Sequence, residues 1–177
     1  MAKATPAPEP SDSIRTAAGV DLTVTGAGPA DHADLYRAFS ALVAAGEGYP
    51  QAPGPLEYHE FSDYWLLHKS FVAVGRTAEC RLAGSYYLRP NFPGRAAHIA
   101  NAGYFVVSNL RDRGIGEALV QHSLATARTL GFDAMQFNLV FASNPARRLY
   151  ERLGFEVVGR VPEAIDGEDA IVYWRKL

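Results

Sequence analysis

Apolar positions along the chain recur with two different periods, and each change of period marks the boundary of an expected element. Where apolar residues return every three or four positions, as at Leu35, Phe39 and Val43, they predict an amphipathic helix with one face in the core. On this basis helices are expected over residues 31–45, 58–68, 114–131 and 145–153.

Short runs rich in β-branched and aromatic residues separate these helices and predict strands. They lie at residues 20–25, 70–74, 82–88, 97–107, 134–141, 155–161 and 170–174. Strands that alternate with helices indicate an α/β (α+β) fold. We expect a mixed, mostly antiparallel, twisted sheet of six to seven strands, flanked by about four helices.

Composition and the N-terminal segment narrow the class of protein. Residues 1–19 contain three prolines and no periodic pattern, so we expect a flexible tail there, followed by one domain over residues 20–177. An apolar fraction of 48% supports a packed core, and the single cysteine, Cys80, excludes an internal disulfide. The net charge of -2 gives no global reason to expect nucleic acid, and no apolar run is long enough to cross a membrane. Without a signal peptide the cytoplasm is the expected location, and scattered histidines predict no metal site.

The sharpest chemical signal is a glycine-rich turn, residues 111–116, between an expected strand and an expected helix. Gly114 and Gly116 let the backbone turn tightly, and the helix N-terminus adds free N–H groups and a positive dipole end. This arrangement favours binding of a pyrophosphate. Leu119 stands where a dinucleotide fingerprint has its third glycine, so that fingerprint fits poorly. The alternative is an ordinary turn with two solvated arginines.

A second signal lies downstream, from Asn144 to Phe155. Leu149, Leu153 and Phe155 have the spacing of core residues. Tyr150 allows two interpretations, because a helical tyrosine beside an apolar run either packs in the core or serves as an acid.

Together these motifs resemble the GCN5-related N-acetyltransferase (GNAT) family. The family's pyrophosphate loop, Arg/Gln-x-x-Gly-x-Gly/Ala, is matched by Arg111, Gly114 and Gly116. Its later motif is matched by Asn144, Ala146, Leu149, Tyr150, Gly154 and Phe155. The resemblance implies acetyl-CoA as co-substrate, bound where two parallel strands, here residues 97–107 and 134–141, splay apart.

The same resemblance implies roles for individual residues. The pantetheine is expected to pair with the strand edge at Phe105, Val106 and Val107. Besides Arg111, the backbone N–H groups of Arg113, Gly114, Ile115 and Gly116 are expected to hold the pyrophosphate. Tyr150 matches the position that returns a proton to the departing thiolate.

Three asparagines carry a narrower resemblance, to the branch that contains the yeast azetidine-2-carboxylate N-acetyltransferase. In that branch the residues matching Asn101, Asn138 and Asn144 lie in the active site. The resemblance implies that Asn101 accepts a hydrogen bond from the substrate nitrogen, and that Asn144 contacts the cofactor. Asn138 and the backbone of Leu139 are expected to donate to the oxyanion. From the residues alone, an asparagine in an apolar strand needs a partner for its amide, and that reason can also be structural.

Three further residues are weaker candidates. His98 stands close to Asn101 in the expected strand and could act as a base, although packed or edge histidines are commoner. Tyr49 and Tyr58 lie in or beside the segment where the family builds its acceptor pocket, but the charged helix face nearby is also typical of a solvated surface.

Three functions remain open at this point. The first is an N-acetyltransferase acting on a small amine, such as a toxic proline analogue or an amine-bearing antibiotic, with a role in resistance or detoxification. The second is a protein N-terminal or lysine acetyltransferase. The third is a non-catalytic acyl-CoA sensor. A homodimer is possible, because dimers are frequent in this family.

Overall fold

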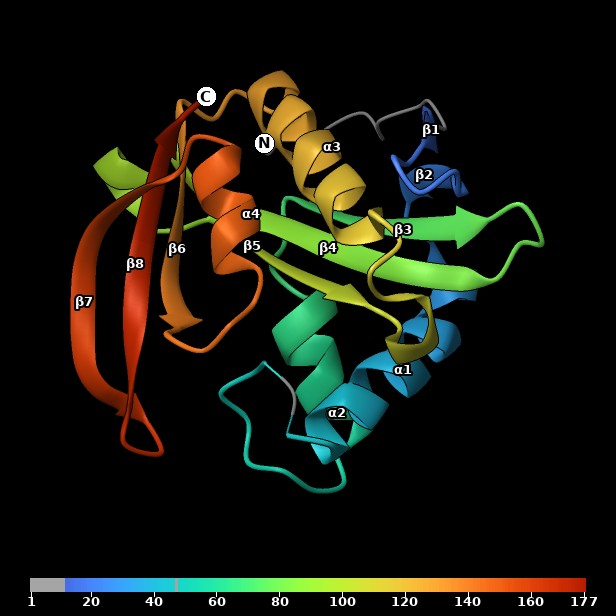
Figure 1. Ribbon diagram of the computed structural model, residues 1–177, viewed down its shortest axis with the longest axis horizontal. Helices are drawn as coiled ribbons and strands as arrows, with labels where there is room; N and C mark the ends of the chain where they lie inside the picture. Colours follow the sequence, from blue (N-terminus) through green and yellow to red (C-terminus); the bar gives the residue numbers. More distant parts are fainter. Residues whose placement is uncertain (1–11, 47) are drawn as a thin grey trace, which may run out of the picture.

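An open eight-stranded sheet lies between two layers of helices in the computed structural model, which describes residues 12–46 and 48–177 (Figure 1). The strand order is β1-β2-β3-β4-β5-β6-β8-β7. The strands are β1 (Asp12–Arg15), β2 (Asp21–Gly26), β3 (Phe71–Thr77), β4 (Leu82–Pro90), β5 (Ile99–Val106), β6 (Ala134–Phe141), β7 (Glu156–Ile165) and β8 (Glu168–Lys176). β5 and β6 run parallel, whereas the other neighbouring pairs are antiparallel.

Four α-helices are present in the described part of the chain: α1 (His32–Ala44), α2 (Tyr58–Phe61), α3 (Ile115–Thr129) and α4 (Arg147–Arg152). The expected helix over residues 58–68 consists of α2 continued by a π-helical turn, Ser62–Leu66. No helix among the residues described combines the length and the apolar character that spanning a membrane requires.

The N-terminal expectation is wrong for residues 12–15. They form β1, which pairs with β2 in the register Asp12↔Val24. The residues of this strand are mostly polar and exposed, so the strand has no hydrophobic period by which the sequence could predict it. Because of β1, the sheet has eight strands rather than the expected six to seven. Residues 1–11 of the expected tail lie outside the described residues.

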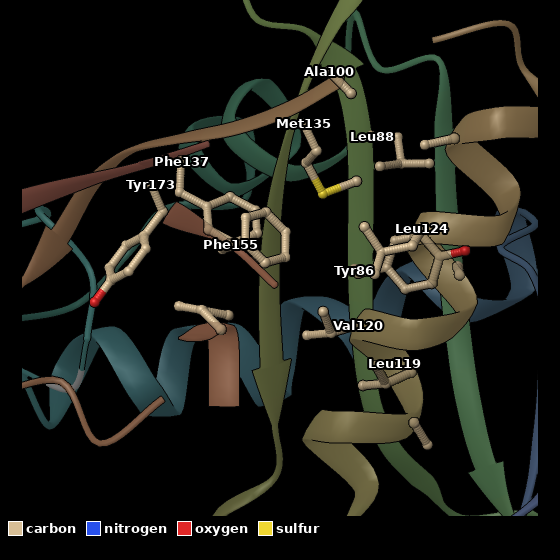
Figure 2. Close-up of a cluster of buried hydrophobic side chains, with 14 of the residues drawn as sticks. Tyr86, Leu88, Ala100, Leu119, Val120, Leu124, Met135, Phe137, Phe155 and Tyr173 are labelled. Atoms are coloured by element: carbon tan, nitrogen blue, oxygen red, sulfur yellow. The ribbon is translucent and has the colours of Figure 1, made fainter. Parts of the chain in front are cut away.

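Two apolar layers cover the two faces of the sheet. On the face of α3 and α4, Tyr86, Met135 and Phe137 pack with Leu119 and other helix residues (Figure 2). On the face of α1 and α2, the packing is largely aromatic; its members include Phe39, Phe61, Trp65, Tyr87 and Phe105. Side chains alternate between faces along a strand, so Asn101 and Phe105 share the face of α1 and α2.

β5 and β6 pair over a short stretch and then part. The paired residues are Ile99↔Ala134 and Ala100↔Met135. Beyond them, residues 101–106 of β5 and residues 136–141 of β6 are not paired with each other (Figure 1). We call the region between these two segments the splay. It is the place at which the sequence predicted two parallel strands to separate.

Candidate active site

The edge of β5 that faces β6 carries backbone groups free of strand pairing in the splay. The carbonyl of Ile99 accepts from Asn91 N–H (2.7 Å), and the N–H of Val107 donates to the carbonyl of Ala83 (3.0 Å). Backbone groups of successive residues point to opposite edges, so the odd-numbered residues face β4 and the even-numbered residues face the splay. Of the three expected pantetheine contacts, Val106 alone therefore presents its N–H and C=O to the splay. Phe105 and Val107 direct theirs toward β4.

Tyr49 closes part of this edge. Its hydroxyl donates a hydrogen bond to the carbonyl of Tyr104, one of the even-numbered residues of β5. Tyr49 belongs to the segment between α1 and α2, so this bond fastens that segment to the splay. Burial is the main cause that raises the pKa of the Tyr49 phenol well above its ordinary value, and neighbouring tyrosines, including Tyr64, add to the effect. The hydroxyl is therefore a donor throughout the physiological pH range.

Asn101 lies at the point where the two strands part. Its side chain is buried, with 7% exposed, and its Nδ2 donates to the carbonyl of Gln136 on β6 (2.9 Å). This bond joins the strands where the backbone ladder stops. Since Nδ2 is committed to Gln136, the atom left for another molecule is Oδ1, for which the described residues supply no hydrogen-bond partner. An acceptor atom in this place suits an amine N–H.

Asn138 belongs to a second group of carboxamides on the same face. It exchanges hydrogen bonds with Asn91: its Nδ2 donates to Oδ1 of Asn91 (2.6 Å), and its Oδ1 accepts from Nδ2 of Asn91 (3.1 Å). Gln136 Nε2 also donates to Oδ1 of Asn138 (2.9 Å). Unlike Asn101, Asn138 is exposed. One N–H of its amide remains for another acceptor.

A β-bulge in β6 separates Leu139 from the ladder. Phe137 pairs with Tyr173 and Val140 with Ile171, so residues 138 and 139 have no counterparts on β8. A bulge of this kind leaves backbone groups unpaired and changes the direction of the strand. The Leu139 side chain is 40% exposed, which is unusual for an apolar residue in a central strand. The bulge thus frees backbone N–H donors beside Asn138.

The glycine-rich turn precedes the 15-residue helix α3. Its two glycines differ in why the position holds a glycine. Gly114 has φ 76°, and a Cβ there would lie 3.1 Å from Cβ of Thr16, so its own backbone and its neighbour require glycine. Gly116 lies in the first helical turn, where a Cβ would meet an ordinary contact, Cγ2 of Val106 at 3.7 Å. Glycine weakens a helix by about 1 kcal/mol relative to alanine. Contacts within the described chain therefore do not explain why position 116 holds a glycine. A glycine that the chain itself does not require, beside free N–H groups, fits a ligand that approaches the backbone closely.

Arg111 and Arg113 flank this turn, and both are exposed. Arg113 borders a cavity of about 480 Å³ between the turn and the β1–β2 and β3–β4 connections. Two cations beside a helix N-terminus favour an anion of high charge density, and the pyrophosphate expected there stays a prediction.

Tyr150 lies on α4, in the apolar layer on the face of α3 and α4. It is 9% exposed, and its ring packs against Phe137 (4.7 Å between centroids) and Phe155 (5.8 Å). Burial, and to a smaller extent Tyr173, raises the pKa of the Tyr150 phenol. The phenol therefore keeps its proton, as an acid must.

The remaining predicted residues lie in varied surroundings. Asn144 is half-buried, and its Oδ1 accepts from the Ala146 N–H (2.9 Å), a turn that starts α4. His98 lies in the turn before β5, exposed, with Nδ1 3.1 Å from the carbonyl oxygen of Arg95. The expected strand therefore starts two residues late, because a 3₁₀ turn, Gly94–Ala96, precedes it. Tyr58 is 46% exposed and borders a separate cavity of about 660 Å³ outside α1.

Three neighbours of the predicted asparagines could not be inferred as such from the sequence: Asn91, Gln136 and Tyr87. Tyr87 covers β5 so closely that a Cβ at Gly103 would lie 2.5 Å from its ring. The glycine in the run Asn101-Ala102-Gly103 was the available signal. Asn91 gave none, because its pairing depends on where the loop after β4 folds back. In the ranges 12–46 and 48–177, no group of three His, Cys, Asp or Glu residues is arranged to hold a metal.

Comparisons with known proteins agree with this geometry. The pattern described as "Acetyltransferase (GNAT) family" matches residues 35–155. A GCN5-related N-acetyltransferase from Kribbella flavida is 34% identical, over 88% of this chain and 98% of that chain, with a TM-score of 0.81. A phosphinothricin acetyltransferase from Sinorhizobium meliloti, solved in complex with AcCoA, has a TM-score of 0.77 at 18% identity, over 88% of each chain.

One curated relative is the N-acetyltransferase aca1 of Schizosaccharomyces pombe, 44% identical over 84 residues. The match spans 47% of this chain and 40% of that protein, so the chain covers less than half of the relative's length. These matches do not confirm the narrower azetidine-2-carboxylate branch. They do identify the family that the order of elements, the glycine-rich turn and the parted strands also indicate. The chain belongs to the GNAT acetyltransferase family.

Proposed function

We propose that the protein transfers an acetyl group from acetyl-CoA directly to the amine of a small molecule. The observation that carries this proposal is the carboxamide of Asn101. It stands where β5 and β6 part, gives its Nδ2 to Gln136, and keeps Oδ1 for a donor from outside the chain. An amine is such a donor. The candidate acceptors are amino or imino acids, among them a toxic proline analogue, and amine-bearing antibiotics.

Acetyl-CoA fits the residues around the splay. The pyrophosphate is expected at the N–H groups of Arg113, Gly114, Ile115 and Gly116, with Arg111 nearby; Gly116 leaves the space that such a group needs. The pantetheine amide groups are expected at the edge of β5, where Val106 has its N–H and C=O free. The AcCoA complex of the Sinorhizobium meliloti protein has the same fold, which supports this choice of co-substrate.

Acetyl-CoA supplies the acetyl group as a reactive thioester. In the transfer, a C–N bond forms, the C–S bond breaks, the amine proton passes to water, and the thiolate gains a proton. Asn101 orients the neutral amine through Oδ1, because a carboxamide is too weak a base to deprotonate it. The free N–H of Asn138 and the Leu139 N–H stabilise negative charge on the carbonyl oxygen. The Tyr150 phenol, protonated at neutral pH, supplies the proton for sulfur.

A small acceptor is favoured over a protein because the approach to Asn101 is covered. The Tyr49 hydroxyl is bonded to the Tyr104 carbonyl, and the ring of Tyr49 packs on Phe39 (4.8 Å between centroids) and Tyr64 (6.2 Å). A protein lysine or N-terminus needs an open groove for the flanking chain, and the segment that carries Tyr49 narrows the space available.

A turnover screen tests the proposal. Purified protein is mixed with acetyl-CoA and a panel of free amines, and thiol release is followed together with the mass of the acetylated product. We expect product with at least one class of small amine. Turnover with peptides alone would indicate a protein acetyltransferase. Tight CoA binding without turnover of any amine would indicate a sensor.

A further inference from the structure

Two cationic side chains lie over one aromatic ring beside Asn101. The Arg89 guanidinium carbon is 5.9 Å, and the Lys69 Nζ 5.0 Å, from the centroid of the Tyr87 ring. Arg89 lies directly opposite Asn101 in the β4–β5 register. Directly opposed residues of antiparallel strands share a face and have Cβ atoms about 4.5–5.5 Å apart. Arg89 therefore stands next to the carboxamide expected to receive the amine.

Neither of these two cations forms an ion pair within 4.0 Å in the described part of the chain. Lys69 Nζ donates to the backbone carbonyls of Leu67 (2.8 Å) and Asp63 (3.3 Å), and no carboxylate lies within 4.0 Å of Arg89. Arg76, by contrast, forms an ion pair with Asp31 at 2.6 Å.

The repulsion between the two cations contributes to a lowered pKa of Lys69. Burial, and then the charge of Arg89, lower the pKa of the Lys69 ammonium to about 8, although the charge of Asp63 opposes the effect. Like charges held near each other raise the free energy of both charged forms, and an anion between or beside them lowers it. Arg89 itself is exposed, so an anion can reach it.

We propose that Arg89 binds a carboxylate of the acceptor, which makes the acceptors α-amino or α-imino acids. This inference rests on the proposed function and specifies its substrate class. Guanidinium and carboxylate form two parallel hydrogen bonds, a geometry that lysine does not reproduce. Because Arg89 and Asn101 are opposed in register and share a face of the sheet, the pair suits a molecule whose carboxylate and amine share one carbon. Lys69 adds positive potential, and its bonds to two backbone carbonyls hold it in place.

The test compares acids with amines that lack the carboxylate. The pairs are azetidine-2-carboxylate with azetidine, and L-phenylalanine with phenethylamine. For the wild type we expect the acid of at least one pair to have the higher kcat/KM. In Arg89→Gln, KM for that acid should rise about 10- to 100-fold, the range expected for a hydrogen bond to a charged group. The kcat/KM of the paired amine should change less than about threefold.

Two further variants make the result specific. Arg95→Gln removes an exposed arginine from the loop that follows β4 and should leave both acceptors unchanged. Arg89→Lys should recover part of the preference for the acid. An unaltered acid-to-amine ratio in Arg89→Gln would overturn the assignment of Arg89, and wild-type preference for the amines would overturn the substrate class. Absence of turnover with any small amine would overturn the proposed function itself, and with it this inference.

Discussion

At the scale of single residues, the two asparagines of the splay have different surroundings. Asn101 is buried and committed by its nitrogen, whereas Asn138 is exposed and held in a reciprocal pair with Asn91. A buried carboxamide with one free acceptor suits substrate orientation. An exposed carboxamide fixed by a neighbour suits donation from its remaining N–H, provided that Asn91 keeps it in position.

The role of Asn138 can be separated from that of its partner. We expect Asn138→Ala to lower kcat about 10²-fold, because a donor to the developing oxyanion is lost. Asn91→Ala removes the positioning bonds but leaves the donor, so its loss should be smaller, below about tenfold. Steady-state kinetics with the best amine of the screen measures both. A loss under threefold for Asn138→Ala would make this asparagine structural.

Tyr150 gives a second prediction at this scale. Tyr150→Phe removes the hydroxyl and keeps the ring that packs on Phe137, so the fold should survive. We expect kcat to fall while KM for both substrates stays within about threefold, because the proton is needed only as the thiolate leaves. Burial raises the pKa of this phenol above 10, the ordinary tyrosine value. Deprotonation of Tyr150 should therefore not reduce wild-type activity below pH 10. An unchanged kcat in the variant would remove Tyr150 from the acid role.

At the scale of elements, the first turn of α3 is the proposed binding site for the diphosphate. Gly116→Val adds a branched side chain beside the free N–H groups, and its Cβ would contact only Val106 among the described residues. We expect the variant to lose most of the rise in melting temperature that CoA gives the wild type. Ala125→Val, on the exposed side of the same helix, controls for the cost of a β-branched residue. Equal CoA-induced shifts in the two variants would show that α3 does not hold the diphosphate through Gly116.

β1 is attached to α3 through a half-buried histidine, His122. Nε2 of His122 lies 3.2 Å from a carboxylate oxygen of Asp12, and its Nδ1 lies 2.7 Å from the Tyr86 hydroxyl. Burial lowers the pKa of His122 below its ordinary value of 6.5, although Asp12 opposes the effect. Below about pH 6.5 the unfolded chain therefore binds more protons at this position than the folded chain, so stability falls as the pH drops.

Urea unfolding at a series of pH values tests this attachment. The free energy of unfolding of the wild type should decrease between pH 7.5 and pH 5.5, and His122→Gln should show a smaller decrease. A steeper decrease in His122→Gln would contradict the direction of the shift.

The sequence predicted which helices and strands are present better than it predicted the residues at which they begin and end. The helical period at Leu35 and Phe39 and the glycines of the α3 turn depend on neighbours within one segment, so they could be predicted. β1 could not, because a short polar strand is stabilised by its pairing with β2. The pair of Asn91 with Asn138 and the place of Arg89 opposite Asn101 also depend on register and loop path, which local sequence does not specify.

At the scale of the whole molecule, the free edge of the sheet bears on the expected homodimer. β7 ends the sheet, and Val157, Val158 and Val161 on it are each more than 40% exposed. Exposed apolar side chains such as these favour burial against a second copy of the chain. We expect light scattering to give twice the chain mass of 19.2 kDa, and Val158→Lys to give the monomer. A wild-type monomer at high concentration would contradict the homodimer.

We propose that the α3 turn and the splay together bind acetyl-CoA, and isothermal titration calorimetry of the wild-type protein with acetyl-CoA measures this binding. We expect saturable heat with one site per chain. Binding should be weaker in Gly116→Val and unchanged in Arg89→Gln, because Arg89 serves the acceptor. If neither acetyl-CoA nor CoA gives heat, at protein concentrations that detect weak binding, the α3 turn and the splay do not form the binding site.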